Sequence, residues 1–354
     1  MKTQRHNFIL PFVSKFSPRE PLLLAAAGEN GGLALISGRD MISSQQNSYL
    51  VNAKIASENT ILDLIFLKDS DTIVLASADE SIRYFDIQTQ LPKRSPSNIP
   101  DWRLLHKGAA RSLTETNKGV IVGYENASIA CWDERQIDPI FLKENISKKK
   151  ELSITSVQSV TDDIFTIGDS FGRVSLWDLR NFKRLSKVPL PNSNQRIGVS
   201  SIDISHNQKY MAITRTNSTL TILEMETFKS YTRRLKGMDS FYNHCKFDPS
   251  GRCVLTGSTS GTLSIIDIAN QEEGSEEQLY CHEAMASSVD WSSIGNYLLS
   301  CSDDKTIQIW RAEYVEAKDD SYFTKKIQFP DAPIEKKEKS LPRFRKLDFY
   351  ANVN

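Results

Sequence analysis

A short strand-like pattern recurs along the whole of this 354-residue chain, and few folds are compatible with it. In each copy, a turn precedes an alternation of apolar and polar residues that ends in a large side chain. An alternation with a period of two residues predicts a β-strand with one buried face. The large end residues follow one another at intervals of 43 to 49 residues. They are Ile36, Phe85, Trp132, Trp177, Leu223, Ile266 and Trp310.

A second apolar run stands upstream of each copy, as in residues 73–77 and 297–301, and we expect it to form a hairpin with the strand that follows. Repeats of roughly 40–45 residues that end in Trp-Asp are typical of WD repeats, with four strands in each blade. The sequence therefore predicts an all-β fold, a seven-bladed WD-repeat β-propeller over residues 1–311. Residues 312–354 would form a short charged C-terminal tail, partly disordered or completing the last blade.

The outer strand of the last blade has two possible sources, residues 1–8 or the tail near residues 322–327, and the sequence leaves both open. The same blade carries a set of polar residues that we expect to form a buried hydrogen-bond network. The other blades lack this set, so we expect them to rely on packing. The network residues are His282, Ser300, Asp304 and Trp310.

Composition narrows the classes of partner. Lys+Arg and Asp+Glu both total 44, so no domain-wide attraction to nucleic acid or anionic membrane is expected, and contact with nucleic acid would be at most indirect. No stretch approaches the roughly 20 apolar residues of a membrane span. The five cysteines have no C-x-x-C spacing and no accompanying His cluster, which favours buried side chains in a reducing compartment. We expect no metal site and no cofactor.

Two basic runs stand apart from the repeats, at residues 148–150 and within residues 336–346. They are interpreted as a solvated loop and a disordered tail, with a nuclear-import signal as the alternative. A nuclear-import signal would agree with a nuclear protein.

Residues 168–172 (Gly-Asp-Ser-Phe-Gly) match the G-x-S-x-G nucleophile elbow of α/β-hydrolases. That motif requires a helix after the serine. Here a predicted strand follows, so the segment is expected to be a hairpin turn. We find no catalytic residues and predict that the protein is not an enzyme.

Two consecutive repeats end in Trp-Asp-x-Arg, at residues 132–135 and 177–180, and we call these segments the arginine boxes. Trp and Asp are residues of the fold, whereas the fold does not require the arginine. The planar guanidinium is well suited to interface contacts. A docking role and a purely structural role both remain open from the spacing. The candidate residues are Trp132, Asp133, Arg135, Trp177, Asp178 and Arg180.

Further segments, in chain order, carry a resemblance to a known family. They are residues 11–12 and 16–17 in the first repeat, 62–64 in the second, 198–202 in the fifth, 240–242, 249 and 257–258 in the sixth, and 288–291 and 301–311 in the seventh. Together with the arginine boxes, they resemble the denticleless family of WD-repeat substrate receptors of cullin-4 RING ubiquitin ligases. The resemblance covers about residues 8–311.

The resemblance implies a non-catalytic ligase subunit in the nucleus. Its arginine boxes would dock a DNA-damage-binding propeller adaptor and, through it, cullin-4. Its substrates would be PCNA-bound regulators of replication and the cell cycle, such as a licensing factor or an inhibitor of ribonucleotide reductase. They would be degraded in S phase and after DNA damage. Residues 344–350 lack the Gln of a PCNA box, so we expect no direct PCNA contact there.

The degrons that this family recognises carry a basic residue. In the predicted propeller, the turns between second and third strands carry carboxylates that could receive it. Acidic groups on one face would favour capture of such a residue. The alternative is that these are ordinary turn residues. The candidates are Glu80, Glu125, Asp169 and Asp303.

A second function remains open from the sequence, namely a WD-repeat scaffold subunit of a nuclear complex with no connection to a ligase. Copurification with the adaptor and cullin-4 would distinguish the two.

Overall fold

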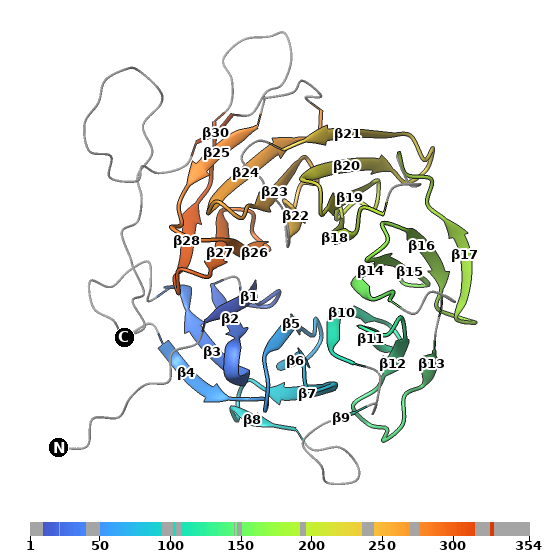
Figure 1. Ribbon diagram of the computed structural model, residues 1–354. Coiled ribbons are helices and arrows are strands. Elements are labelled where there is room, and N and C mark those ends of the chain that lie inside the picture. Colours follow the sequence, from blue (N-terminus) through green and yellow to red (C-terminus); the bar gives the residue numbers. More distant parts are fainter. Residues whose placement is uncertain are drawn as a thin grey trace, which may run out of the picture.

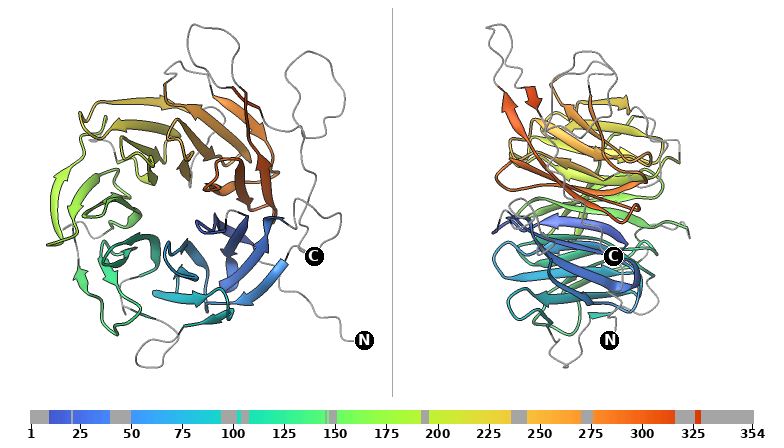
Figure 2. Two further views of the ribbon diagram at one scale, coloured as in Figure 1. Left: turned by 180° about the vertical axis from the view of Figure 1, so that it is seen from behind. Right: turned by 90° about the vertical axis from the view of Figure 1, so that its left-hand side faces the viewer.

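Seven antiparallel sheets stand around a central axis like the blades of a propeller (Figure 1). The computed structural model describes residues 10–20, 22–39, 50–93, 102–103, 108–144, 146, 151–191, 196–235, 244–269, 276–315 and 326–328. The expected all-β, seven-bladed propeller is confirmed. Seen edge-on, the blades form a ring about as thick as one strand is long (Figure 2).

The blades follow the order of the chain, and in each blade the first strand lies nearest the axis. Blade 1 comprises β1 (Pro11–Phe16), β2 (Leu23–Gly28), β3 (Gly32–Ser37) and β4 (Leu50–Ile55). Blade 2 comprises β5 (Ile61–Phe66), β6 (Thr72–Ser77), β7 (Ser81–Asp86), β8 (Leu91–Pro92) and β9 (Trp102–Arg103). Blade 3 comprises β10 (Ala110–Thr116), β11 (Gly119–Tyr124), β12 (Ile129–Trp132) and β13 (Phe141–Lys143).

The remaining blades repeat this arrangement. Blade 4 comprises β14 (Ile154–Thr161), β15 (Ile164–Asp169), β16 (Val174–Asp178) and β17 (Lys183–Lys187). Blade 5 comprises β18 (Val199–Ile204), β19 (Tyr210–Arg215), β20 (Thr219–Glu224) and β21 (Ser230–Arg234). Blade 6 comprises β22 (Cys245–Phe247), β23 (Cys253–Gly257), β24 (Thr262–Asp267) and β25 (Glu277–Tyr280). Blade 7 comprises β26 (Ala286–Trp291), β27 (Tyr297–Ser302) and β28 (Ile307–Arg311).

The large residues that end the third strands occupy one equivalent position. Each lies opposite the second residue of the preceding strand, as Trp310 lies opposite Leu298 and Phe85 opposite Ile73. The same register holds in the other five blades. All seven side chains are buried. The repeat seen in the sequence is therefore a repeat of strand register.

The core is a ring of hydrophobic clusters, one at each junction between neighbouring blades. At the last junction, for example, Leu299 and Ile309 of blade 7 pack with Phe16 of blade 1. The expectation of one buried face is wrong for several of the recurring third strands, and β12 is buried at every position. Each sheet packs between two neighbours, so both of its faces are covered.

Blades 2 and 7 differ from a simple four-stranded sheet. In blade 2 the outer strand is split, because β8 pairs with the end of β7 and β9 with its beginning. Blade 7 has three strands in the described residues. β30 (Lys326–Gln328) pairs with β29 (Glu313–Val315) and not with β28. The other candidates for an outer strand, residues 1–8 and 322–325, lie outside the described residues.

Successive strands are antiparallel, so turns alternate between the two faces of the ring. Turns between first and second strands share one face with turns between third and fourth strands. We call this the arginine face, because both arginine boxes lie on it. Turns between second and third strands lie on the opposite face. Among the described residues, no helix is long and apolar enough to cross a membrane.

Candidate functional site

The two arginine boxes occupy equivalent turns of neighbouring blades. Trp132 ends β12 and Trp177 lies next to the end of β16, and both indole rings are buried. The box arginines fall in the turns that lead to β13 and β17. Arg135 and Arg180 therefore stand one blade apart on the arginine face.

The box aspartates build these turns. Asp133 accepts the backbone N–H of Arg135 at 3.0 Å, and Asp178 accepts that of Arg180 at 2.8 Å. In blade 6, Asp267 accepts the N–H of Ala269 at 2.9 Å in the same way, without any arginine. An aspartate that binds the backbone two residues ahead is a common turn element. The aspartate thus forms this turn with or without an arginine two residues ahead, so the arginine is additional.

Each box arginine is held by the aspartate of its own box. Arg135 donates from Nε and Nη2 to the two oxygens of Asp133, at 2.9 and 2.7 Å. Arg180 makes the same pair of bonds to Asp178, both at 3.1 Å. These bonds hold the pKa of both aspartates below the ordinary value. The arginine side chains nevertheless remain 83% and 68% exposed. The two guanidinium groups are oriented but accessible.

Contacts between blades fix the spacing of the boxes. Lys118, in the turn between β10 and β11, donates to the carbonyl oxygens of Leu179 and Arg180 at 3.0 and 3.2 Å. Phe141 of blade 3 stacks on Phe182 of blade 4, with 4.0 Å between ring centroids and 5° between ring planes. The two turns therefore form one continuous surface.

The acidic candidates lie in or beside turns of the opposite face, and ion pairs hold Glu125 and Asp169. Glu125 pairs with Arg111 at 2.9 Å and Asp169 with Arg173 at 2.7 Å. Glu80 occupies a turn position with a positive φ of 69°. In Asp303, Oδ1 is buried without a hydrogen-bond partner.

The Asp303 carboxyl lies in an unfavourable electrostatic environment. Burial raises its pKa, and the neighbouring carboxylates of Asp304 and Glu29 add to this effect. Of the four acidic candidates, Asp303 has the strongest physical reason to receive a cation.

The four predicted network residues of blade 7 lie together. The Ser300 hydroxyl bonds to His282 Nε2 at 2.8 Å and accepts from the Trp310 indole at 3.5 Å, while Asp304 bonds to His282 Nδ1 at 2.9 Å. Burial opposes the charged form of Asp304, but hydrogen bonds from His282 and Thr306 outweigh it and lower its pKa. These groups satisfy one another and leave no free nucleophile.

The expectation that the other blades rely on packing is wrong for blade 2. There the Ser57 hydroxyl bonds to Ser77 at 2.7 Å and to Asp79 at 3.0 Å. Asp79 also pairs with Arg83 at 2.9 Å. Ser57 takes the place that His282 has in blade 7, and serine carries no signal that would single it out in a sequence.

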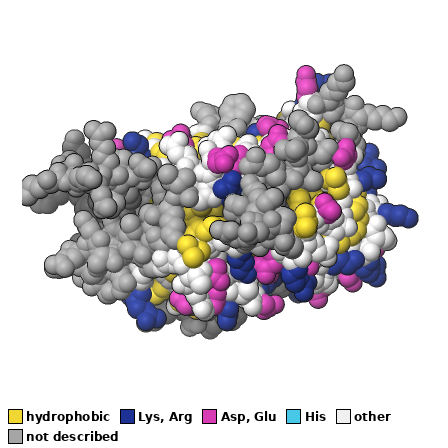
Figure 3. Space-filling model, turned by 90° about the horizontal axis from the view of Figure 1, so that it is seen from below, with side chains coloured by type: hydrophobic (Ala, Val, Ile, Leu, Met, Phe, Trp, Pro, Cys, Tyr) yellow, Lys and Arg dark blue, Asp and Glu magenta, His cyan; other side chains and the backbone are white. Residues whose placement is uncertain are grey.

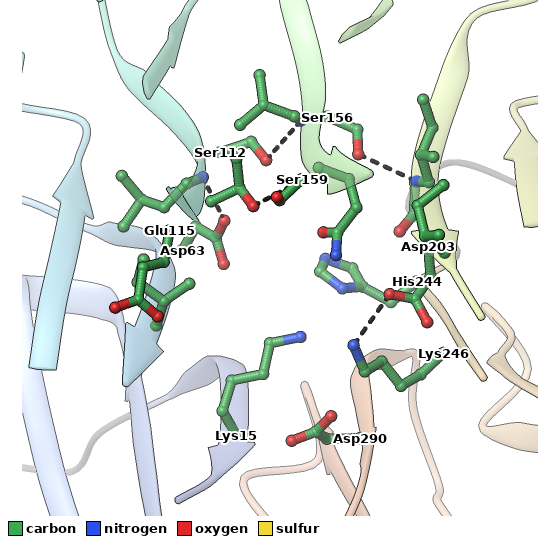
Figure 4. A pocket seen from close by; sticks show the side chains of 18 of the residues that line it. Lys15, Asp63, Ser112, Glu115, Ser156, Ser159, Asp203, His244, Lys246 and Asp290 are labelled. Carbon is green, nitrogen blue, oxygen red and sulfur yellow. Dashed lines mark hydrogen bonds and ion pairs between the residues drawn. The ribbon is translucent and has the colours of Figure 1, made fainter. Parts of the chain in front are cut away.

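A polar cavity of about 500 Å³ follows the central axis and is lined by the first strands (Figure 4). Its side chains tie neighbouring blades together. Asp63 of blade 2 accepts the N–H of Leu113 in blade 3 at 2.7 Å, and Asp203 of blade 5 accepts that of Phe247 in blade 6 at 2.7 Å. Serines make similar bonds from blade 3 to blade 4 and from blade 4 to blade 5. Much of the cavity wall is therefore structural.

Charges alternate around part of this cavity, from Asp203 and Lys246 to Asp290 and Lys15. Lys246 pairs with Asp203 at 2.9 Å. Lys15 points into the cavity (Figure 4). This arrangement was not predicted from the sequence, although Asp63 and Asp290 lie in segments that carry the family resemblance.

The structure also accounts for the G-x-S-x-G segment and the cysteines. Residues 168–172 comprise the end of β15 and most of the turn to β16, where Gly172 donates its N–H to the Asp169 carbonyl at 3.0 Å. A strand follows the serine, as expected for a hairpin. Among the described residues no group of His, Cys, Asp and Glu could hold a metal ion, and all five cysteines are free. The basic residues 148–150, 336–346 and the segment 344–350 lie outside the described residues.

Known proteins resemble this chain in sequence. The family "WD domain, G-beta repeat" matches residues 229–267 and 275–311. Cell division cycle protein cdt2 of Schizosaccharomyces pombe is 23% identical, over 86% of this chain and 69% of that protein. Denticleless protein homolog A of Xenopus laevis is 24% identical, over 85% of this chain and 48% of that protein. U3 small nucleolar RNA-associated protein 12 of Saccharomyces cerevisiae is 26% identical, over 67% of this chain and 24% of that protein.

The sheets and their repeated register define a seven-bladed β-propeller, and two of its repeats match the WD-repeat family model. Within that class, the expected resemblance to the denticleless family is confirmed by homologues from zebrafish, Xenopus and chicken. The chain spans about half the length of these vertebrate relatives.

Proposed function

We propose that the protein is a non-catalytic, nuclear substrate receptor of a cullin-4 RING ubiquitin ligase. Arg135 and Arg180 dock the DNA-damage-binding propeller adaptor. The receptor then presents PCNA-associated regulators of replication and the cell cycle for degradation in S phase and after DNA damage. The similarity to denticleless homologues supports this assignment.

One observation carries the proposal. Two exposed guanidinium groups stand at equivalent turns, each oriented by an aspartate that also forms the turn. Side chains ordered before binding lose less entropy when they bind. Arginine is also enriched among the residues that dominate protein interfaces. The pair therefore has the properties of a docking site without a structural need for the arginines.

The test is the double substitution Arg135→Ala with Arg180→Ala. Each arginine at an interface hot spot contributes about 2 kcal/mol or more, roughly a thirtyfold change in affinity. We expect the double variant to lose the adaptor and cullin-4 in copurification, to retain its substrates, and to allow those substrates to accumulate in S phase. Its melting temperature should stay close to that of the wild type, because both side chains are exposed.

Arg19→Ala is the matched control. Arg19 lies on the same face, is 51% exposed and pairs with Asp71 at 2.9 Å. It should retain the adaptor. If the double variant also retains the adaptor, the ligase assignment loses its support.

A second candidate is a scaffold subunit of a nuclear complex without a ligase. The similarity to U3 small nucleolar RNA-associated protein 12 supports it, over a smaller part of this chain. The same copurification separates the two, since a scaffold of this kind brings down neither the adaptor nor cullin-4.

A further inference from the structure

Exposed apolar side chains gather beside the arginine boxes. Ile137 and Ile140, in the turn after the first box, are 55% and 38% exposed. Leu91 in β8 of blade 2 is 57% exposed. On the edge of the ring that carries β8 and β13, hydrophobic side chains stand among charged ones (Figure 3). Single exposed apolar residues are normal on a protein surface, whereas a group on adjacent blades indicates an interaction site.

Contacts between blades make these residues one surface. Two residues beyond Leu91, Lys93 pairs at 2.8 Å with Glu134 of the first box. On the other side, Ile140 precedes Phe141, whose ring stacks on Phe182 of the second box turn. The apolar residues lie on blades 2 and 3, and these contacts connect their segments to both boxes.

The exposed charge of the two boxes is positive. The Arg135 and Arg180 side chains are 83% and 68% exposed, whereas those of Asp133 and Asp178 are only 11% and 5% exposed. Asp138 adds one exposed carboxylate to the same turn. A partner that fits this surface carries apolar side chains bordered by carboxylates.

We infer that Ile137, Ile140 and Leu91 form the apolar centre of the surface that docks the adaptor, with Arg135 and Arg180 at its border. This inference rests on the proposed function. It matches the usual anatomy of an interface, in which desolvated apolar residues at the centre are surrounded by polar groups that exclude water. The isoleucines then add apolar contact to the affinity that the two arginines contribute.

The experiment is a binding titration of the purified adaptor against the full chain carrying Ile137→Asp with Ile140→Asp. A carboxylate forced into an apolar contact should weaken binding at least about tenfold while both arginines remain in place. Ile137→Ser with Ile140→Ser should weaken it in the same direction, which separates loss of apolar contact from charge repulsion. Melting temperatures of both variants should stay near the wild-type value.

Ile294→Asp is the matched control, since Ile294 is 50% exposed in a turn of the arginine face on blade 7. It should bind like the wild type. Unchanged binding by the aspartate and serine variants, with the double arginine variant unable to bind, would overturn this inference and leave the proposed function intact. A wild-type chain that does not bind the adaptor would overturn both.

Discussion

Asp290 on the first strand of blade 7 accepts the backbone N–H of Phe16 on the first strand of blade 1, with 2.8 Å between nitrogen and oxygen. Next to it, the Ser288 hydroxyl accepts the N–H of Ser14 at 3.3 Å. These bonds join residues 274 positions apart in the chain. They close the ring where its first and last blades meet.

Asp290→Ala should therefore destabilise the protein by about 1–3 kcal/mol, because it leaves the buried N–H of Phe16 without a partner. Chemical denaturation at pH 7 measures the loss. Asp71→Ala, which removes a more exposed carboxylate, should change stability by no more than about 0.5 kcal/mol. Equal effects of the two substitutions would contradict a role for Asp290 in closing the ring.

Asp63 should make stability depend on pH. Burial raises the pKa of this carboxyl from 3.8 to about 6, despite the hydrogen bonds that it accepts. The native state then holds a proton that the unfolded chain has released, so stability falls as pH rises from about 4 to 6. The shift corresponds to about 3 kcal/mol over this range. Unfolding free energies at several pH values would measure it.

The comparison with Asp63→Asn isolates this effect. His244 acts in the opposite direction, because burial lowers its pKa from 6.5 to about 3. Its neutral form is favoured in the native state, so the protein loses stability through this group as pH falls. His244 is present in both proteins, so its effect cancels in the comparison. As pH rises from 4 to 6, the wild type should therefore lose stability relative to Asp63→Asn. A difference that does not change with pH would show that the carboxyl is not perturbed.

Trp310→Ala should cost about 3–5 kcal/mol, as a large truncation in the core. The ring is buried at the junction of blades 6 and 7, and its indole donates to Ser300. Tyr280→Ala, at a site that is 77% exposed, serves as the control and should stay within about 0.5 kcal/mol. Calorimetric melting distinguishes the two.

Two substitutions test the hairpin at residues 168–172. Ser170→Ala should leave biological activity unchanged and cost about 1 kcal/mol, since Ser170 Oγ accepts one backbone N–H from Ser153. Gly172→Ala should be far more destabilising, because φ is +80° and the new Cβ would lie 2.1 Å from the Ile197 carbonyl oxygen. Loss of activity in a fully folded Ser170→Ala variant would instead indicate a catalytic serine.

Substrate capture can be tested on the face opposite the arginines. Charge reversal by Glu80→Lys with Glu125→Lys should slow substrate turnover in cells, because a basic degron residue would meet repulsion. Adaptor copurification should be unaffected. Glu226→Lys, an exposed residue in a turn of the arginine face, is the control. Unchanged turnover in the double variant would remove these acidic turns from the proposed function.

The sequence predicts the third strands well, because their end residues occupy one register in all seven blades, from Ile36 to Trp310. It predicts the first strands poorly. Six of the seven contain a register shift, as between Ile61 and Asp63. A shift breaks the two-residue period, so the sequence no longer indicates which side chain faces the axis.

Similar reasons limited the prediction of the site. The arginine boxes are contiguous in sequence and could be found by spacing. The contacts around them join residues about 40 to 60 positions apart, such as Lys93 with Glu134 and Lys118 with Leu179. Such pairs become visible only when neighbouring blades are placed side by side.

The antiparallel course of the strands has a consequence for assembly. A strand of six residues such as β6 is about 20 Å long, and this length separates the turns of one face from those of the other. A protein seated on Arg135 and Arg180 would thus leave the turn of Asp303 open to a second protein. The ring would then separate the two proteins by the length of a strand, so that neither would occupy the face used by the other.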